Sequence, residues 1–317
     1  MPNNFADRML EAIARKKTPA VIAVDPVYSR LPAQIAEHRD LNDETDVEAA
    51  LDASLEFCRR VIRIVAPLVP AVKLNSAYFE RYYSEGIEGY YELIQEAAEH
   101  ELLVIGDVKR GDIGPSSEMY ARAHLAEPDF TNLDNVLAPD AVTINGYFGI
   151  DGAKPFIDIA RTHEQGKGVF VLVRTSNESA ASIQDVFLAD GRRFYEAMGA
   201  QVAQWAAESG TVGRRGYSSI GAIVSIRDAG AAARLRAALP QSLFLVPGYG
   251  AQGLTAQDVA PLFKSDGSGA MIVAGRSVIY AYEEARYLEM YASEWDKCIE
   301  QACKDFINDI GQVVRID

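Results

Sequence analysis

Short apolar runs rich in β-branched residues recur along the chain, and each ends in a polar or glycine-containing turn. Continuous apolar runs, in place of strict alternation, are typical of parallel strands that are covered on both faces. The runs predict eight strands, at residues 20–25, 71–75, 102–107, 140–145, 169–174, 220–226, 242–247 and 270–275.

Helical patterns separate these runs. The clearest has apolar residues three and four positions apart, which places them on one helix face: Val47, Leu51, Leu55, Cys58, Ile62 and Val65. Further helices are predicted at residues 118–126, 193–209 and 231–238, and near the N-terminus at Phe5, Met9, Leu10 and Ile13. Residues 26–44 form a long polar connection, and the chain from residue 277 onward is predicted to be helical, with a break near 293–295.

Strands that alternate with helices predict parallel βαβ units. Eight such units favour a closed barrel over an open sheet. We therefore expect an α/β fold, a single-domain (β/α)8 TIM barrel over residues 1–317 with an N-terminal helix and a C-terminal helical extension. In such barrels the chemistry takes place at the carboxyl ends of the strands.

Charge narrows the possible partners. The net charge of −14 disfavours binding to nucleic acid and to acidic membrane surfaces. The N-terminus lacks the pattern of a signal peptide, and no apolar run is long enough to span a membrane. We expect a cytoplasmic protein. The odd number of cysteines and the absence of a CxxC pair predict buried thiols, and the histidines show no metal-ligand spacing.

Charged residues gather where the first three predicted strands end. The third strand leads into Asp107-Val108-Lys109, and residues two apart in a strand face the same way. Lys73 ends the second strand and Asp25 the first. Asp112 follows shortly and could return to the same mouth or reach a neighbouring subunit. A solvated rim or a structural ion-pair network is the alternative, but five charges at three successive strand ends favour catalysis.

This cluster suits proton donation. The flanking carboxylates favour the charged form of Lys109. A protonated lysine in a dry site can protonate a developing carbanion. A Schiff-base lysine needs the opposite surroundings, so an imine mechanism is disfavoured.

A phosphate site is predicted after strands seven and eight. Residues 247–253 (PGYGAQG) and 274–277 (AGRS) follow these strands, where phosphate sites of such barrels commonly lie. Glycine permits close backbone approach, and Arg276 can hold phosphate oxygens with two hydrogen bonds. Gln252 could add a donor.

Together these residues resemble the orotidine 5′-phosphate decarboxylase family, especially its longer bacterial branch. The resemblance is carried by residues 72–80 (VKLNSAYFE), 106–114 (GDVKRGDIG), 173–177 (VRTSN), 247–253 (PGYGAQG) and 275–276. It implies decarboxylation of orotidine 5′-monophosphate to UMP, the last step of de novo pyrimidine biosynthesis, with no metal or organic cofactor.

The resemblance also implies roles for individual residues. Lys109 would protonate carbon 6, Asp107 would lie near the substrate carboxylate, and Lys73 would bind the ribose and Asp107. Asp112 and Ile113 would enter the site of a partner subunit, so a homodimer with a shared active site is expected. Further substrate contacts are implied for Asp25, Asn75, Ser116, Ser176, Gln252, Gly275 and Arg276. Two alternatives stay open, a related sugar-phosphate decarboxylase or aldolase and a non-catalytic nucleotide-binding barrel.

Overall fold

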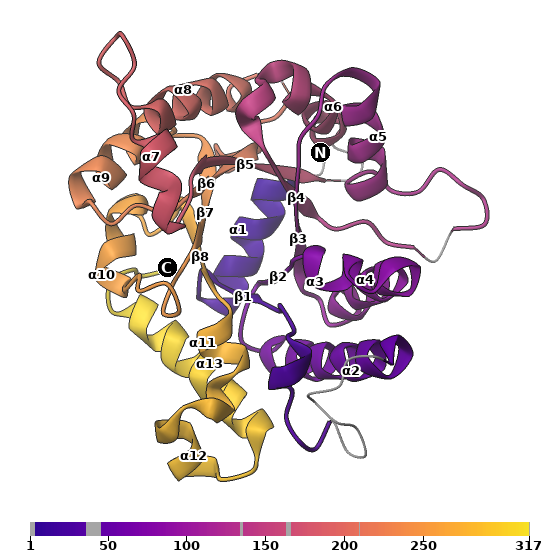
Figure 1. The fold of residues 1–317 in the computed structure, drawn as a ribbon. Coiled ribbons are helices and arrows are strands. Elements are labelled where there is room, and N and C mark those ends of the chain that lie inside the picture. Colours follow the sequence, from indigo (N-terminus) through magenta and orange to yellow (C-terminus); the bar gives the residue numbers. More distant parts are fainter. Residues whose placement is uncertain (1–3, 36–45, 134–135, 163–165, 209, 317) are drawn as a thin grey trace.

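Eight parallel strands close into one barrel (Figure 1). The computed structural model describes residues 4–35, 46–133, 136–162, 166–208 and 210–316. The strands are β1 (Ala20–Ala23), β2 (Ala71–Leu74), β3 (Leu103–Arg110), β4 (Ala141–Ile144), β5 (Gly168–Arg174), β6 (Ser218–Val224), β7 (Ser242–Pro247) and β8 (Ala270–Ala274). Each pairs with the next, and β8 pairs with β1. The predicted barrel is confirmed, although β3 runs three residues further than predicted because its end is polar.

Helices surround this barrel. They are α1 (Phe5–Lys16), α2 (Val47–Val65), α3 (Ala77–Glu80), α4 (Tyr83–Glu99), α5 (Gly114–His124), α6 (Ile150–Arg161), α7 (Ala181–Gln184), α8 (Phe194–Ala206), α9 (Ala229–Ala238), α10 (Ala256–Val259), α11 (Arg276–Ile279), α12 (Ala285–Tyr291) and α13 (Trp295–Gly311). Short 3-10 turns are η1 (Tyr28–Arg30), η2 (Gly146–Phe148), η3 (Glu178–Ala180), η4 (Ala260–Leu262) and η5 (Ala281–Glu283).

Several helix limits differ from the predicted ones. Helix α5 begins four residues earlier than expected, because Pro115 fits the first turn of a helix. Helix α9 begins two residues early, where the side chain of Asp228 accepts the N–H of Ala231 and caps it. The predicted break near residues 293–295 is confirmed between α12 and α13. Within the predicted connection 26–44, η1 forms, and residues 36–44 lie outside the described residues.

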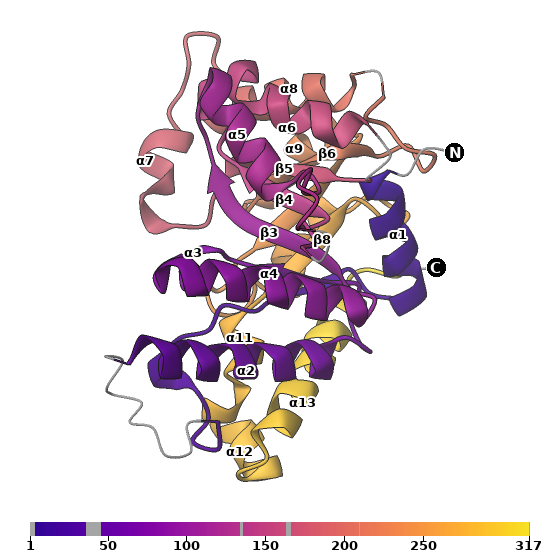
Figure 2. The same ribbon diagram turned by 90° about the vertical axis from the view of Figure 1, so that its right-hand side faces the viewer.

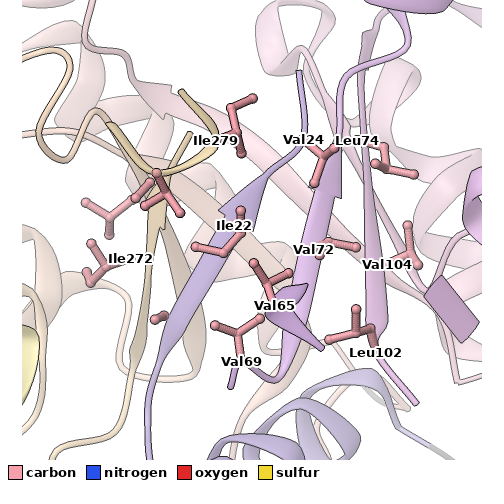
Figure 3. Close-up of a cluster of buried hydrophobic side chains, with 14 of the residues drawn as sticks. Ile22, Val24, Val65, Val69, Val72, Leu74, Leu102, Val104, Ile272 and Ile279 are labelled. Atoms are coloured by element: carbon pink, nitrogen blue, oxygen red, sulfur yellow. The ribbon is translucent and has the colours of Figure 1, made fainter. Parts of the chain in front are cut away.

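The continuous apolar runs reflect two core layers. Val21 and Ala23 face the inside of the barrel and belong to the smaller apolar cluster. Ile22 and Val24 face outward and pack with Val65 of α2 in the larger cluster (Figure 3). Because alternate residues of β1 are buried on opposite faces, the strand needs apolar side chains at every position.

Helix α1 closes the end of the barrel where the strands begin (Figure 2). Phe5 meets Phe170 of β5 edge to face, with ring centroids 5.7 Å apart. The carboxylate of Asp7 accepts the backbone N–H groups of Arg214 and Arg215 at 2.8 and 2.9 Å. The opposite end, where the strands finish, is left for a ligand.

The C-terminal extension fastens the end of β1. The hydroxyl of Tyr280 accepts the N–H of Val27 at 2.7 Å and donates to the carbonyl oxygen of Asp25 at 3.0 Å. The guanidinium of Arg30 lies 3.7 Å from the centre of the Tyr280 ring. The extension therefore fixes the backbone of Asp25 from a position more than 250 residues away in the sequence.

The cysteines agree with their prediction: Cys58, Cys298 and Cys303 are buried and unpaired. None of the helices formed by the described residues is long and apolar enough to cross a membrane.

Candidate active site

Four alternating charges form a row across the carboxyl ends of β1, β2 and β3. Lys73 Nζ donates to Asp107 Oδ2 at 2.8 Å and lies 3.6 Å from Asp25 Oδ1. Lys109 Nζ donates to Asp107 Oδ1 at 2.5 Å. We call Asp25, Lys73, Asp107 and Lys109 the Lys–Asp array. The parallel pairing of β1, β2 and β3 places their ends at the same mouth, as the sequence predicted.

The array runs from the protein interior to the surface. The side chains of Lys73 and Asp107 are 7% and 8% exposed, whereas that of Lys109 is 46% exposed. Oδ1 of Asp25 is buried and accepts no hydrogen bond from the described residues. The row therefore has a buried, paired centre. A ligand can reach the ammonium group of Lys109, and Asp25 Oδ1 can accept a further hydrogen bond.

Charge pairing outweighs burial at the centre of the array. Burial alone would raise the pKa of Asp107, but the ammonium groups of Lys73 and Lys109 hold the pKa of that carboxyl well below its ordinary value. Burial alone would lower the pKa of Lys73, but the two neighbouring carboxylates raise that pKa above its ordinary value. For Asp25 burial dominates and the pKa is raised. At neutral pH the Lys73–Asp107 pair is thus ionised.

The backbone at Lys109 departs from a regular strand. Its φ is 44°, and the register between β3 and β4 shifts between Gly106 and Arg110. Thr143 of β4 lies against this irregularity: its Oγ1 accepts the N–H of Lys109 at 3.0 Å and donates to Asp107 Oδ1 at 2.8 Å. Thr143 carries no signal in the sequence beyond one polar residue within an apolar run.

Asp112, Ile113 and Ser116 lie apart from the array, at the start of α5. Asp112 Oδ1 accepts the N–H of Ile113 at 2.7 Å, and Ile113 is 53% exposed. Within the described part of the chain, no hydrogen bond or ion pair joins Asp112 to the array. Both alternatives for Asp112, the mouth of its own barrel and a partner's site, stay predictions.

A cavity of about 460 Å³ opens at the ends of β5, β6 and β7. Ser176 and Gln252, both predicted site residues, line it together with Arg227. Arg227 Nη2 donates to the carbonyl oxygen of Gln252 at 2.6 Å, which fixes the loop after β7. Arg227 was not predicted, because a single arginine directly after the sixth predicted strand belongs to none of the motifs.

The other predicted contacts lie around the same barrel end. Gly275 and Arg276 join β8 to α11, and Arg276 is exposed there. A Cβ at Gly275 would lie 3.2 Å from Ala23 Cβ, so glycine permits the close approach of β8 to β1. Asn75 Oδ1 accepts the N–H of Ala77 at 3.1 Å and so caps the turn into α3. Neither Gly275 nor Arg276 is among the residues that line the cavity of about 460 Å³.

Candidate metal ligands do not cluster in the described part of the chain. Among the residues that the structure describes, no group of three or more His, Cys, Asp or Glu side chains is placed to hold a metal ion. His38 and His163 lie outside the described residues. The expectation of a reaction without metal or organic cofactor stays a prediction.

Comparison with known proteins identifies the family. The sequence model of the "Orotidine 5'-phosphate decarboxylase / HUMPS family" matches residues 45–291. The chain belongs to this family. Among its relatives, the orotidine 5′-phosphate decarboxylase of Caldicellulosiruptor bescii is 34% identical over 281 residues, which cover 88% of this chain and 90% of the relative. That of Caldicellulosiruptor saccharolyticus is 34% identical over 306 residues, or 96% and 98% of the two chains.

A solved structure extends the match to three dimensions. Leishmania donovani OMP decarboxylase superposes with a TM-score of 0.70 at 26% sequence identity, over 98% of both chains. The family, the barrel and the decarboxylase class predicted from the sequence are thereby confirmed.

Proposed function

We propose that this chain decarboxylates orotidine 5′-monophosphate to UMP and carbon dioxide. The observation that carries the proposal is the Lys–Asp array, which stands at the open end of a barrel of this family with its centre buried and ionised. Loss of carbon dioxide from carbon 6 leaves an electron pair with little resonance stabilisation. Preorganised charge and a nearby proton are therefore what the reaction needs from the protein.

Lys109 is the proposed proton donor. As the bond between carbon 6 and the carboxylate breaks, its electron pair stays on carbon 6 and takes a proton from Lys109 Nζ, leaving a neutral amine. Asp107, kept ionised by Lys73, would lie beside the substrate carboxylate and disfavour the bound substrate more than the departing neutral carbon dioxide. Lys73 would bind the ribose while it holds Asp107 in place.

The remaining predicted contacts divide between the two ends of the substrate. Asp25, whose Oδ1 accepts no hydrogen bond from the described residues, is proposed to accept one from the ribose, with Asn75 nearby. Ser176 would contact the pyrimidine, and Gln252, Gly275 and Arg276 the phosphate. That Ser176 and Gln252 line one cavity supports their joint use. Binding energy from the phosphate can hold the base against the array.

We propose further that the active unit is a homodimer in which Asp112 and Ile113 complete the partner's site. Exposed apolar side chains surround the start of α5: Met119 is 55% exposed, Tyr147 74% and Phe148 45%. A groove of about 1640 Å³ runs along α5 and α6 and is lined by Ile113 and Met119 among others. Contiguous exposed apolar surface of this kind marks an interaction site.

Mixing two inactive variants tests the shared site. Lys109→Ala and Asp112→Ala would each be inactive alone, but a hybrid dimer contains one site with both residues intact. After subunit exchange the mixture should recover roughly a quarter of the wild-type activity, because half of the dimers are hybrids with one good site each. No recovery, with exchange confirmed by differently tagged subunits, would show that Asp112 does not act across subunits.

The reaction itself is tested by following orotidine 5′-monophosphate in excess EDTA through the loss of its ultraviolet absorbance. Turnover to UMP would support substrate, reaction and metal independence at once. Binding of UMP without turnover would favour the non-catalytic barrel. Neither binding nor turnover, with activity on a sugar phosphate after addition of magnesium, would favour the related sugar-phosphate enzyme.

A cytoplasmic location stays a prediction.

A further inference from the structure

Lys109 has a backbone conformation that residues with a side chain rarely adopt. Its φ of 44° falls in the left-handed region, and it is neither glycine nor asparagine. Such a conformation costs free energy and persists only where neighbouring groups hold it. Something in the structure must therefore hold the backbone of the proposed proton donor.

Thr143 is the group that lies in position to do so. It is fully buried on β4, and its Oγ1 accepts the N–H of Lys109 at 3.0 Å. The same Oγ1 donates to Asp107 Oδ1 at 2.8 Å, and this carboxylate oxygen also accepts Lys109 Nζ at 2.5 Å. One hydroxyl thus joins the main chain of Lys109 to the carboxylate that its own side chain contacts.

The direction of these hydrogen bonds is fixed by chemistry. A backbone N–H can only donate, so the Thr143 oxygen is the acceptor at Lys109. An ionised carboxylate can only accept, so the single hydroxyl proton must point at Asp107. Both roles are filled at once, which leaves the Thr143 side chain one orientation. A valine at this position would match its shape and supply neither bond.

We propose that Thr143 is a positioning residue for the proton donor. It holds Lys109 in the left-handed conformation and turns Asp107 so that Oδ1 faces Lys109 while Oδ2 faces Lys73. Because Thr143 is fully buried, its proposed role is to act through Lys109 and Asp107 and not by contact with the substrate. This inference rests on the proposed function, since it assigns Thr143 a part in the same proton transfer.

The proposal predicts different effects on kcat and on KM. Without the hydroxyl, the Lys109 N–H loses its acceptor and the strained backbone is free to relax, which moves Nζ away from carbon 6. A displacement of about 1 Å at a reacting group lowers turnover roughly a hundredfold. Substrate binding should change little, because the groups assigned to the phosphate and ribose stay in place. Thr143→Val should therefore lower kcat strongly and alter KM less than about threefold.

The experiment compares Thr143→Val, Thr143→Ser and Thr211→Val with the wild type. Serine keeps the hydroxyl, so Thr143→Ser should retain most of the activity. Thr211 is a matched control: it is also fully buried, and its hydroxyl donates to the carbonyl oxygens of Ala206 and Glu208 beside the closed end of the barrel. Thr211→Val should lower the melting temperature and leave kcat near the wild-type value.

Two kinetic results would overturn the proposal. One is a Thr143→Val enzyme with kcat within about threefold of the wild type. The other is a loss in Thr143→Ser as large as that in Thr143→Val, because serine keeps the hydroxyl and the activity would then not follow its hydrogen bonds. A wild type that does not turn over orotidine 5′-monophosphate would refute the proposed function instead. Crystal structures would then decide, because an unchanged Lys109 backbone in Thr143→Val or, if that variant does not fold, in Thr143→Ala would refute the positioning role.

Discussion

Replacing Lys73 by methionine tests whether the array is as desolvated as its geometry indicates. Methionine has similar length and no charge. In the wild type, Lys73 Nζ lies 2.8 Å from an oxygen of Asp107 and 3.6 Å from one of Asp25. Its removal leaves two carboxylates facing each other in a poorly hydrated site without their shared cation.

The expected cost follows from that burial. Removing one partner of a buried ion pair destabilises a protein by about 3–5 kcal/mol. Since the side chain of Lys73 is 7% exposed and serves two carboxylates, we expect about 4 kcal/mol. For a domain of this size that corresponds to a fall in melting temperature of roughly 6 °C. Lys154→Met is the control, because Lys154 and Asp158 form an exposed helical pair worth about 0.5 kcal/mol or less.

The loss of stability caused by Lys73→Met should depend on pH. Once Lys73 is gone, the pKa of Asp25, which burial already raises, should rise further above its value in the unfolded chain, because the nearest cation is lost. A group whose pKa is raised by folding stabilises the folded state when protonated, and this stabilisation is lost as the pH rises through the folded value. The deficit relative to wild type, measured by urea unfolding, should thus be larger at pH 8 than at pH 5. A deficit below about 1 kcal/mol, equal at both pH values, would refute a desolvated array.

Three further predictions concern different parts of the molecule. Arg276→Ala should raise KM for orotidine 5′-monophosphate ten- to a hundredfold, about 1.5–3 kcal/mol for a charged hydrogen bond, and leave kcat/KM for orotidine, which has no phosphate, unchanged. Asp7→Ala should cost about 2 kcal/mol in urea unfolding, because two N–H groups at the closed end lose their acceptor, while kcat stays the same. Because the pKa of Asp107 is lowered in the folded state, its contribution to stability is fully present at neutral pH, begins to fall below the ordinary carboxyl range and is lost only as the pH falls through the lowered folded value. Asp107→Asn should therefore destabilise more at pH 7 than at pH 3; equal losses would contradict the lowered pKa.

The barrel and most of the Lys–Asp array could be predicted from the sequence because both depend on local patterns. A strand buried on both faces must be apolar throughout, and strand ends in a parallel barrel meet at one mouth. Asp25, Lys73 and Asp107 could therefore be placed together from their positions at the ends of three strands. The end of β3 was misjudged because Val108, Lys109 and Arg110 do not continue the apolar run.

Contacts between segments far apart in the sequence could not be predicted from local patterns. The hydroxyl of Tyr280 reaches the backbone at Asp25 across more than 250 residues, and nothing near either residue indicates the pairing. The role of Thr143 follows only from the φ of Lys109, because a regular strand would need no such support. The proposed partner contact of Asp112 belongs to a second subunit and has no counterpart within one chain.

The central claim is that Lys109 supplies the proton in the decarboxylation of orotidine 5′-monophosphate. The most direct test measures UMP formation by Lys109→Ala beside the wild type, with binding of UMP to both proteins measured by calorimetry. We predict that the variant binds UMP and forms none from orotidine 5′-monophosphate, while the wild type turns over rapidly in EDTA. A variant that decarboxylates at a near-normal rate would contradict the assignment of the proton donor and, with it, the proposed role of the array.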